Sequence, residues 1–345
     1  MSTTMTNEER LLLSYPNIAS RLFNKPLMIE GEKLQILVDA LANHSTHLKS
    51  SNFTKTLTLS QDKEDENKKE EMEEPFRLVE NAGVIDVFGT LVHRSGWMDS
   101  LSGLTSYNSI RTAVLASQES SKTTHTILRF DSSGGETDGC FDLADFLFKI
   151  QEEKPIFSFI NERACSAAYL LASATSKIFM TQSGTCGSIG VRTRHVDYSQ
   201  ANSARGVVVT DLFVGDKKNV GSQDQPLLEK DKEYILSHLN KFYGLFVEKV
   251  ALFRGISEKA IRNTEASIFI GSDGLKENLV DGILDVTEVL QECQKQALEI
   301  NSKNKSKRNS NMDMSTTTVK KNLTLVVGTS GSAESITLST PTSPT

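Results

Sequence analysis

Ser166 lies where a short apolar segment gives way to a run of small, helix-favouring residues, and this junction constrains the fold most strongly. Residues 154–160, Lys-Pro-Ile-Phe-Ser-Phe-Ile, are bulky and apolar, which predicts a buried strand. Residues 167–174 contain neither Gly nor Pro, which favours a helix. A serine between the two meets unpaired backbone N–H groups and a helix dipole, which suits a nucleophile whose attack creates an oxyanion. An ordinary N-cap serine fits the same local pattern.

Predicted strands and helices alternate around this junction. The expected strands cover residues 83–89, 126–131, 154–160, 177–180 and 206–214, and the expected helices cover residues 141–150, the run after Ser166 and much of 225–255. Strands that alternate with helices usually form a parallel sheet. The pattern therefore predicts an α/β fold with mostly parallel sheets covered by helices, closed by a turn, a short helix and a strand over 271–286.

Changes in composition divide the chain into four predicted parts. Residues 1–50 carry two amphipathic patches, which predicts an N-terminal helical segment. Residues 51–78 end in a strongly charged run and are predicted as an acidic, disordered linker. Residues 79–295 hold the predicted main domain. Residues 296–345 are rich in Ser, Thr, Lys and Asn, which predicts a flexible, disordered tail.

Composition also argues against several classes of protein. The formal net charge of −6 disfavours a general nucleic-acid binder, which needs a basic face. The four cysteines have scattered spacings without a CxxC pair, so we expect reduced thiols and no zinc site. We find no phosphate-binding glycine loop, and so predict neither a cofactor nor a metal. No signal pattern or apolar run of membrane-spanning length is present, so we expect a protein that makes no membrane contact.

Three further stretches bear on Ser166, and each follows a predicted strand. Residues 131–136, Asp-Ser-Ser-Gly-Gly-Glu, put two glycines where the backbone can turn an N–H toward a pocket. Residues 185–191, Thr-Cys-Gly-Ser-Ile-Gly-Val, form a small-residue loop that can approach another segment closely. Residues 214–227 form a polar loop with two lysines, which are usually solvated but can act as general bases when burial lowers their pKa. Each pattern alone also fits an ordinary turn.

In order and spacing, these stretches are similar to those of the signal peptide peptidase A class of serine proteases. The motifs that carry the resemblance are Asp131-Ser-Ser-Gly-Gly135, the Ala-x-Ser-Ala-Ala-Tyr segment around Ser166, and Gly187-Ser-Ile-Gly-Val191. Within that class the chain most resembles the bacteriophage head-maturation (prohead) proteases of the minor capsid protein C type. That branch is indicated by Asp142-Leu-Ala-Asp145, His195-Val-Asp-Tyr-Ser199, the Gly-x-x-Lys loop before Pro226-Leu227, and Asn24-Lys-Pro-Leu-Met-Ile29.

The resemblance implies a crotonase/Clp-protease-like fold and a Ser–Lys dyad. Ser166 would be the nucleophile, and Lys218 the general base that takes its proton. Ser188 matches the hydroxyl that orients the lysine amine in this class. The oxyanion hole would consist of the backbone N–H groups of Gly134 or Gly135 and of Ala167. An acyl-enzyme would form and be hydrolysed by water, with the substrate lying extended along a strand edge beside the two glycines.

Other assignments fit parts of the same sequence. The lysine register could shift by one residue to Lys217. Cys165 could be read as a thiol nucleophile, although a buried packing role is common for such a residue. His195 beside Asp197 would permit a Ser–His–Asp scheme. Ser133 stands where the family usually has proline, which loosens the turn without removing its N–H donors.

The resemblance further implies an endopeptidase that cleaves scaffold and capsid proteins, with itself as a further candidate substrate, during phage head maturation. We expect a ring- or dome-shaped homo-oligomer that also meets the portal protein, in the host cytoplasm and within the prohead or virion. The acidic linker and the Ser/Thr tail are candidate self-cleavage or docking regions. Two alternatives stay open: a cytosolic enzyme like the signal peptide peptidases, and an inactive structural protein associated with the capsid or portal.

Overall fold

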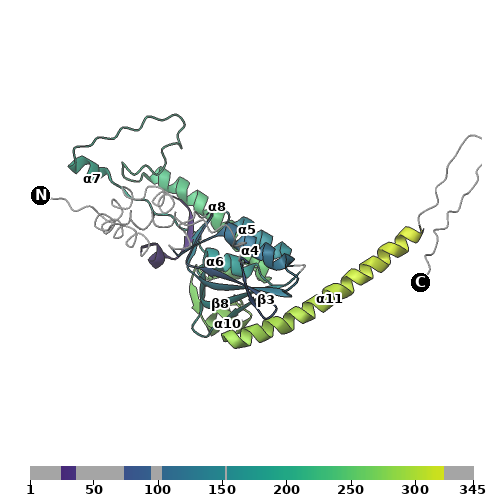
Figure 1. The fold of residues 1–345 in the computed structure, drawn as a ribbon. Coiled ribbons are helices and arrows are strands. Elements are labelled where there is room, and N and C mark those ends of the chain that lie inside the picture. Colours follow the sequence, from purple (N-terminus) through teal and green to yellow (C-terminus); the bar gives the residue numbers. More distant parts are fainter. Residues whose placement is uncertain (1–24, 36–73, 95–102, 152–153, 322–345) are drawn as a thin grey trace, which may run out of the picture. The chain divides into compact units, whose positions relative to one another are not determined.

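The computed structural model describes residues 25–35, 74–94, 103–151 and 154–321, with side chains described as far as residue 304 (Figure 1). Contacts divide the chain into two units, residues 1–297 and 298–345. All of the predicted site residues belong to the first unit, so the description below concerns that unit unless stated otherwise.

A large, mostly parallel sheet forms the body of the domain. Its main path runs β11-β10-β8-β6-β3-β2, and β9 pairs with both β8 and β12. The central strands β3, β6 and β8 are mutually parallel. The long strand β8 pairs with β9 in its first half and with β10 in its second half, both in parallel. The strands are β2 (Arg77–Val79), β3 (Ala82–Phe88), β6 (His125–Ser132), β8 (Ile156–Cys165), β9 (Lys177–Met180), β10 (Thr185–Gly187), β11 (Ile268–Ile270) and β12 (Gly282–Ile283).

A second, four-stranded sheet lies at the carboxyl ends of β3 and β6, in the order β1-β7-β4-β5. β4 runs parallel to both β5 and β7, whereas β1 is antiparallel to β7. On its other side β1 forms an isolated antiparallel bridge from Leu27 to Arg192. The strands are β1 (Leu27–Ile29), β4 (Thr90–Val92), β5 (Leu104–Ser106) and β7 (Gly134–Glu136).

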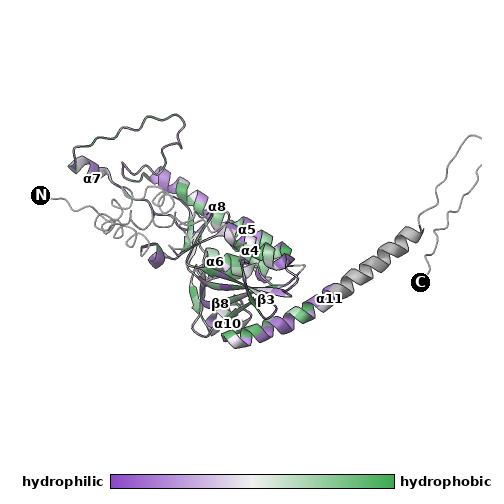
Figure 2. Cartoon of the chain, viewed as in Figure 1, coloured by the Kyte–Doolittle hydropathy of each residue, from purple (hydrophilic) through white to green (hydrophobic). Residues whose placement is uncertain are grey.

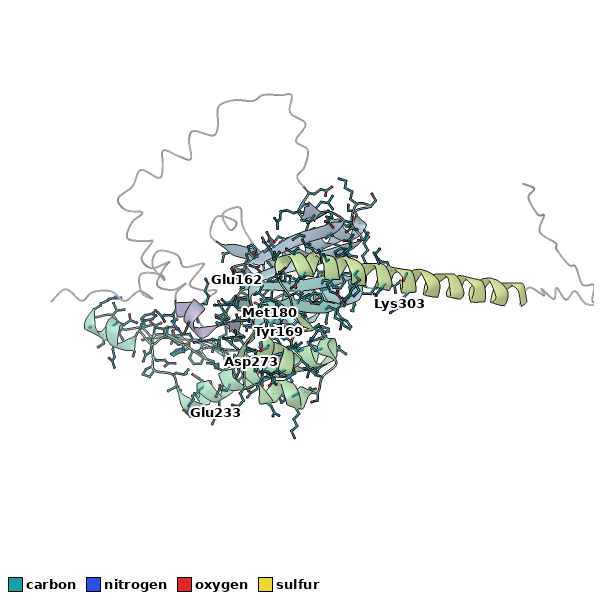
Figure 3. The ribbon with its side chains drawn as sticks, turned by 90° about the horizontal axis from the view of Figure 1, so that it is seen from below. Glu162, Tyr169, Met180, Glu233, Asp273 and Lys303 are labelled. Atoms are coloured by element: carbon teal, nitrogen blue, oxygen red, sulfur yellow. The ribbon has the colours of Figure 1, made fainter. Side chains whose placement is uncertain are left out.

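The helix after Ser166, α6 (Ala167–Ser173), is the most deeply buried helix of the described chain. All of its residues are inaccessible to solvent, and Figure 2 colours it as hydrophobic. Its alanines allow neighbouring elements to approach closely, and Tyr169 points into the body of the domain (Figure 3). The other helices are α4 (Tyr107–Glu119), α5 (Cys140–Ile150), α7 (Ser199–Ala204), α8 (Glu229–Arg254), α9 (Glu258–Asn263), α10 (Ser272–Lys276) and α11 (Val286–Lys321). None of the described helices is long and apolar enough to cross a membrane.

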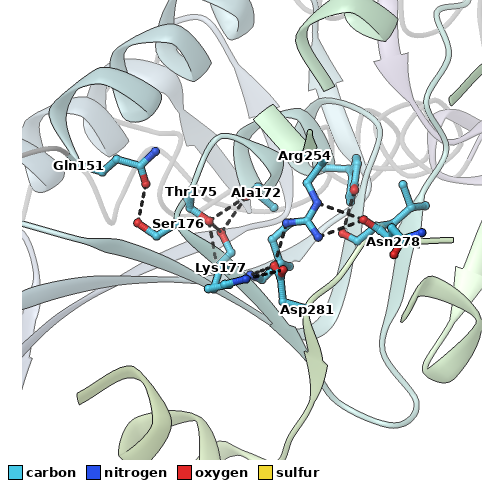
Figure 4. Close-up of polar contacts among 12 residues, drawn as sticks. Gln151, Ala172, Thr175, Ser176, Lys177, Arg254, Asn278 and Asp281 are labelled. Atoms are coloured by element: carbon cyan, nitrogen blue, oxygen red, sulfur yellow. Dashed lines mark hydrogen bonds and ion pairs between the residues drawn. The ribbon is translucent and has the colours of Figure 1, made fainter. Parts of the chain in front are cut away.

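A polar brace holds the end of α8 against β9 (Figure 4). Arg254 forms an ion pair with Asp281 at 2.7 Å, and its guanidinium also donates to the Asn278 carbonyl. Asp281 in turn pairs with Lys177 at 3.1 Å and accepts the Ile178 N–H at 2.8 Å. Burial acts to raise the pKa of the Asp281 carboxyl, but these bonds outweigh burial and hold it below its ordinary value. The brace therefore fixes the end of α8, a helix that packs on α6.

The α/β class predicted from the sequence is confirmed, and so are the strands expected at 83–89, 126–131 and 177–180. β8 runs five residues beyond its predicted end at Ile160, to Cys165. The strand predicted over 206–214 is wrong for the single chain, because Val207–Val214 forms no strand and is exposed. A β-branched run becomes a strand only where a partner edge is available.

The predicted domain boundaries fall partly on residues that the structure describes. In the predicted N-terminal segment, residues 25–35 are described, and β1 there joins the sheet of the main domain. Residues 51–73 and 322–345 of the predicted linker and tail lie outside the described residues. α11 continues through Lys321, across residues predicted as tail. Val289, Cys293 and Ala297 recur at intervals of four and are buried, which gives the first turns of α11 an apolar face.

Candidate active site

Ser166 sits on a strained turn between β8 and α6. Its backbone has φ 56° and ψ −119°, a conformation rarely adopted by residues other than glycine. The Ser166 N–H donates to the Gly187 carbonyl at 2.9 Å, which fixes the turn. The side chain makes no capping bond to α6, and its hydroxyl instead donates to the Gly190 carbonyl at 3.4 Å. The serine therefore does not act as an ordinary N-cap, and its Oγ is directed toward the 187–190 loop.

Gly134 is packed against the start of α6, so that only glycine fits there. Its φ is +97°, and a Cβ at this position would overlap the Met28 carbonyl oxygen and lie 3.0 Å from the Ala167 nitrogen. The Gly134 N–H donates to Ser132 Oγ at 3.2 Å. As the first residue of α6, Ala167 has an N–H outside the helix's own hydrogen-bond pattern. Two of the predicted oxyanion-hole residues are thus brought together beside Ser166.

Gly135, the alternative oxyanion donor, lies one residue further along β7. A Cβ at Gly135 would overlap the backbone of Leu91 in β4, so the two strands are in close contact here. Gly135 is also opposite Met28 of β1 in the antiparallel register. Both edges of β7 are therefore paired, one with β4 and the other with β1.

Ser188 lies in the loop that holds Ser166 in place. It follows Gly187, the acceptor of the Ser166 N–H, and has a positive φ of 52°. Its own N–H donates to the Ser267 carbonyl at 2.8 Å. The half-buried Ser188 thus belongs to the same small cluster of backbone bonds as Ser166.

Lys218 lies elsewhere, in an exposed loop. Its backbone N–H closes a turn with the Gly215 carbonyl at 2.9 Å, and its side chain is exposed. Lys217 places its ammonium group 5.0 Å from the centre of the Tyr234 ring. Among the described residues, no hydrogen bond joins either lysine to Ser166. The single chain therefore assembles Ser166, Ser188, Gly134 and Ala167, and leaves Lys218 apart.

The alternative nucleophile and base gain no support from the geometry. Cys165 is fully buried, and burial raises the pKa of its thiol far above the ordinary value, which disfavours a thiolate. The two ring nitrogens of His195 are buried and have no hydrogen-bond partner among the described residues. The Asp197 carboxylate instead accepts the Ser199 N–H at 2.8 Å. No Ser–His–Asp relay is formed. His195 lines a cavity of about 220 Å³ with Tyr234 and other side chains.

One neighbour of the site was missed by the sequence analysis. Glu30, directly after β1, forms an ion pair with Arg163 of β8 at 2.9 Å, and its N–H donates to the Ser133 carbonyl at 3.2 Å. Arg163 also donates to Ser133 Oγ at 3.3 Å. The motif Asn24-Lys-Pro-Leu-Met-Ile29 was noted only as a point of resemblance. It carried no signal that this segment would reach the predicted oxyanion hole.

Comparison with known proteins agrees with this geometry. Residues 149–300 match the model of peptidase family S49, a span that contains Ser166, Ser188 and Lys218. The chain therefore carries a peptidase S49 domain, and the family resemblance inferred from the motifs is confirmed.

Among curated proteins, the relatives include two phage proteins. The chain is 32% identical to the head-tail preconnector protein GP5 of Enterobacteria phage P21, over 79% of this chain and 56% of that protein. It is 30% identical to the capsid assembly protease C of Escherichia phage lambda, over 83% of this chain and 66% of that protein. A putative signal peptide peptidase SppA of Enterococcus faecium is 27% identical over 48% of this chain and 49% of that protein. The chain thus spans about half to two thirds of the length of these relatives.

Proposed function

We propose that this chain is a serine endopeptidase in which Ser166 is the nucleophile and Lys218 the general base. The observation that carries the proposal is the strained turn at Ser166, whose hydroxyl does not cap α6 but donates to the Gly190 carbonyl, while Gly134 packs against the nitrogen of the next residue, Ala167. Backbone strain of this kind is retained where the surrounding structure needs a particular side-chain direction. A peptidase S49 domain over the same residues supports the reaction class.

The proposed reaction proceeds through an acyl-enzyme. The uncharged Lys218 amine takes the proton of Ser166 as its Oγ attacks the peptide carbonyl carbon. The N–H groups of Ala167 and of Gly134 or Gly135 stabilise the resulting oxyanion. Collapse of this intermediate expels the amine half of the substrate, which leaves with the proton from Lys218. Water, deprotonated by the same amine, then hydrolyses the ester, and Ser188 orients the amine by accepting its hydrogen bond.

The lysine is supplied by a neighbouring copy of the chain. Lys218 closely follows Val207–Val214, an apolar segment that pairs with no strand of the part of the chain that the structure describes. Val208, Leu212 and Val214 are 90%, 93% and 97% exposed, which is costly for such residues in water. Docking this segment against a second copy would bury it and carry Lys218 with it. We therefore propose a homo-oligomer, either a ring or a dome, in which each active site is shared by two copies.

The proposed substrates are scaffold and capsid proteins, with this chain itself as a further candidate, during the maturation of a phage head. This assignment rests on the names of the phage relatives, one a capsid assembly protease and the other a head-tail preconnector. The portal protein is a proposed assembly partner on the ground of the family resemblance of the sequence. The proposed location is the host cytoplasm, within the prohead. A role like that of the signal peptide peptidases is the alternative, since such an enzyme is also among the relatives.

Mixing two inactive variants tests the shared dyad. Ser166→Ala and Lys218→Ala should each abolish cleavage of co-expressed capsid and scaffold proteins, read by mass spectrometry. Reassembled from a one-to-one mixture, they should recover roughly a quarter of wild-type activity, because one site in four then pairs an intact serine with an intact lysine. Lys217→Ala is the matched control and should remain active. Full activity of Lys218→Ala alone would contradict the dyad.

A non-enzymatic assembly protein is the second candidate, favoured by one observation. Ser166 is only 1% exposed in the single chain. A serine-reactive fluorophosphonate separates the two functions, because an inactive scaffold would not be labelled at Ser166 in the assembled state, whereas a peptidase would.

A further inference from the structure

The strand β1 lies between two backbone segments and pairs with both of them. On one side it pairs antiparallel with β7, with Ile29 opposite Gly134 and Met28 opposite Gly135. On the other side, Leu27 and Arg192 exchange two backbone hydrogen bonds of 2.8 and 2.9 Å. β1 thus fills a channel, one wall of which is the glycine edge of the proposed oxyanion hole and the other the segment that follows the Ser188 loop.

The backbone of β1 is aligned like an extended peptide at this edge. The Glu30 N–H, directly after β1, donates to the Ser133 carbonyl. In an antiparallel pair, every second residue turns its backbone N–H and C=O toward the partner strand. Met28, two residues earlier, therefore directs its carbonyl toward Gly135. The packing at Gly134 agrees with this direction. A Cβ added to Gly134 would overlap the Met28 carbonyl oxygen and lie 3.0 Å from the Ala167 nitrogen. A carbonyl of this chain thus faces the groups proposed to stabilise an oxyanion.

Burial indicates that the channel is closed while β1 is in place. Met28 is fully buried and belongs to the main hydrophobic core, as do Ala164 and Ala167 on either side of the nucleophile. Leu27 and Ile29 are also buried. Ser166, next to this channel, is itself almost inaccessible. A substrate could not reach the same edge of β7 without displacing this strand.

We propose that Leu27–Ile29 takes the place of a bound substrate, so that the folded chain is self-blocked and a substrate segment binds by exchanging with β1. This inference rests on the proposed function. The groups that line the channel indicate which ligand would bind there. It is an extended peptide segment that adds a strand to β7 and buries an apolar side chain in the position of Met28. Scaffold or capsid segments of that pattern, and the corresponding segment of a second copy, would compete with β1.

The attachment of β1 is suited to exchange. The strand has only three residues, so its ladder with β7 is short. Glu30 is a charged anchor of this segment: its Oε2 pairs with Arg163, its carboxylate also interacts with the Cys165 thiol, and its Oε1 is buried with no further hydrogen-bond partner among the described residues. A buried, half-satisfied carboxylate weakens the docked state. Release of β1 returns that carboxylate to water.

A reversible crosslink tests the self-block in the full chain. Leu27→Cys with Arg192→Cys places two thiols on directly bridged residues, so oxidation locks β1 in the channel. Fluorophosphonate labelling of Ser166 should fall at least about tenfold on oxidation and recover on reduction. Arg77→Cys with Val84→Cys, which joins β2 to β3, is the matched control and should label equally in both states. Equal labelling of the Leu27–Arg192 pair when oxidised and reduced would overturn the proposal.

A binding measurement tests strand exchange independently of the proposed peptidase reaction. In a Ser166→Ala background, a fluorescent peptide of residues 23–32 is titrated against the full chain and followed by anisotropy. Met28→Asp should free the channel and tighten binding at least about tenfold, whereas Leu78→Asp on exposed β2 should not. Unchanged affinity in Met28→Asp would overturn strand exchange. Tighter peptide binding together with no labelling of any reduced protein would overturn the proposed peptidase and leave the strand-binding channel standing.

Discussion

Gly134 shows how a single residue joins the fold to the proposed chemistry. It needs a positive φ, and it has no room for a side chain because the Met28 carbonyl and the start of α6 press against it. The pair of glycines after β6 was visible in the sequence, but Gly-Gly alone also fits an ordinary turn. What the sequence could not supply was the identity of the group that presses on Gly134, since that group lies more than a hundred residues earlier in the chain.

Gly134→Ala should reduce turnover far more than it reduces stability. A Cβ would push β7 away from Ala167 and misplace an oxyanion donor, for which the expected loss in kcat is about 100- to 1,000-fold. Gly103→Ala is the matched control, because Gly103 also has a positive φ of +71° but nothing within 4 Å of an added Cβ. It should lose only about 1–2 kcal/mol of unfolding free energy. Equal kcat values for the two variants would contradict the assignment of the oxyanion hole.

His125 should make the stability of the domain depend on pH. Its ring is buried against Phe157, and burial lowers the pKa of the imidazole from 6.5 to about 4. Between those two pH values the unfolded chain binds a proton that the folded chain does not. Stability should therefore fall as the pH drops from about 6.5 to about 4, by on the order of 3 kcal/mol for this residue.

Urea unfolding measured across that pH range checks the prediction. His125→Gln removes the titrating group. As the pH falls toward 4, the wild type should therefore lose unfolding free energy that the variant keeps. Identical pH profiles for the two proteins would show that His125 does not titrate in this window.

At the scale of elements, the strand–serine–helix unit was predictable and its surroundings were less so. The apolar run before Ser166 and the alanine-rich run after it predict β8 and α6 locally, and both are present. β1 was not predicted as a strand, because three residues carry no readable periodicity and its partners are distant in sequence. α4 was likewise not predicted.

The segment Val207–Val214 illustrates the opposite error. Its composition favours a strand, yet it forms none, because a strand needs a partner edge and no described strand pairs with it. Motif spacing predicts Ser166, Ser188 and Gly134 at one place, and each of them follows a strand of the same sheet. The same spacing could not say that Lys218 would stand apart, because an exposed loop is positioned by what it docks against.

At the scale of the whole molecule, the proposed Ser166–Lys218 dyad forms only in the proposed assembly of several copies. Replacing Val208 and Leu212 together by Asp would place two charges in the exposed segment that the proposed interface buries. The double variant should sediment as a monomer and keep the unfolding transition of the domain. It should lose peptidase activity, because Lys218 of a neighbouring copy would no longer reach Ser166. Leu78→Asp, which alters an exposed leucine on β2, should keep both assembly and activity. A fully active monomer would contradict the shared site.

The most direct test of the central claim is to map a covalent serine probe on the assembled protein. Fluorophosphonate treatment followed by peptide mass spectrometry should find one adduct, on Ser166, and none in Ser166→Ala. In Lys218→Ala the labelling rate should fall at least about 100-fold, because the hydroxyl then lacks its base. Cleavage of capsid proteins by a preparation in which Ser166 stays unlabelled, or labelling that is indifferent to Lys218, would contradict the account.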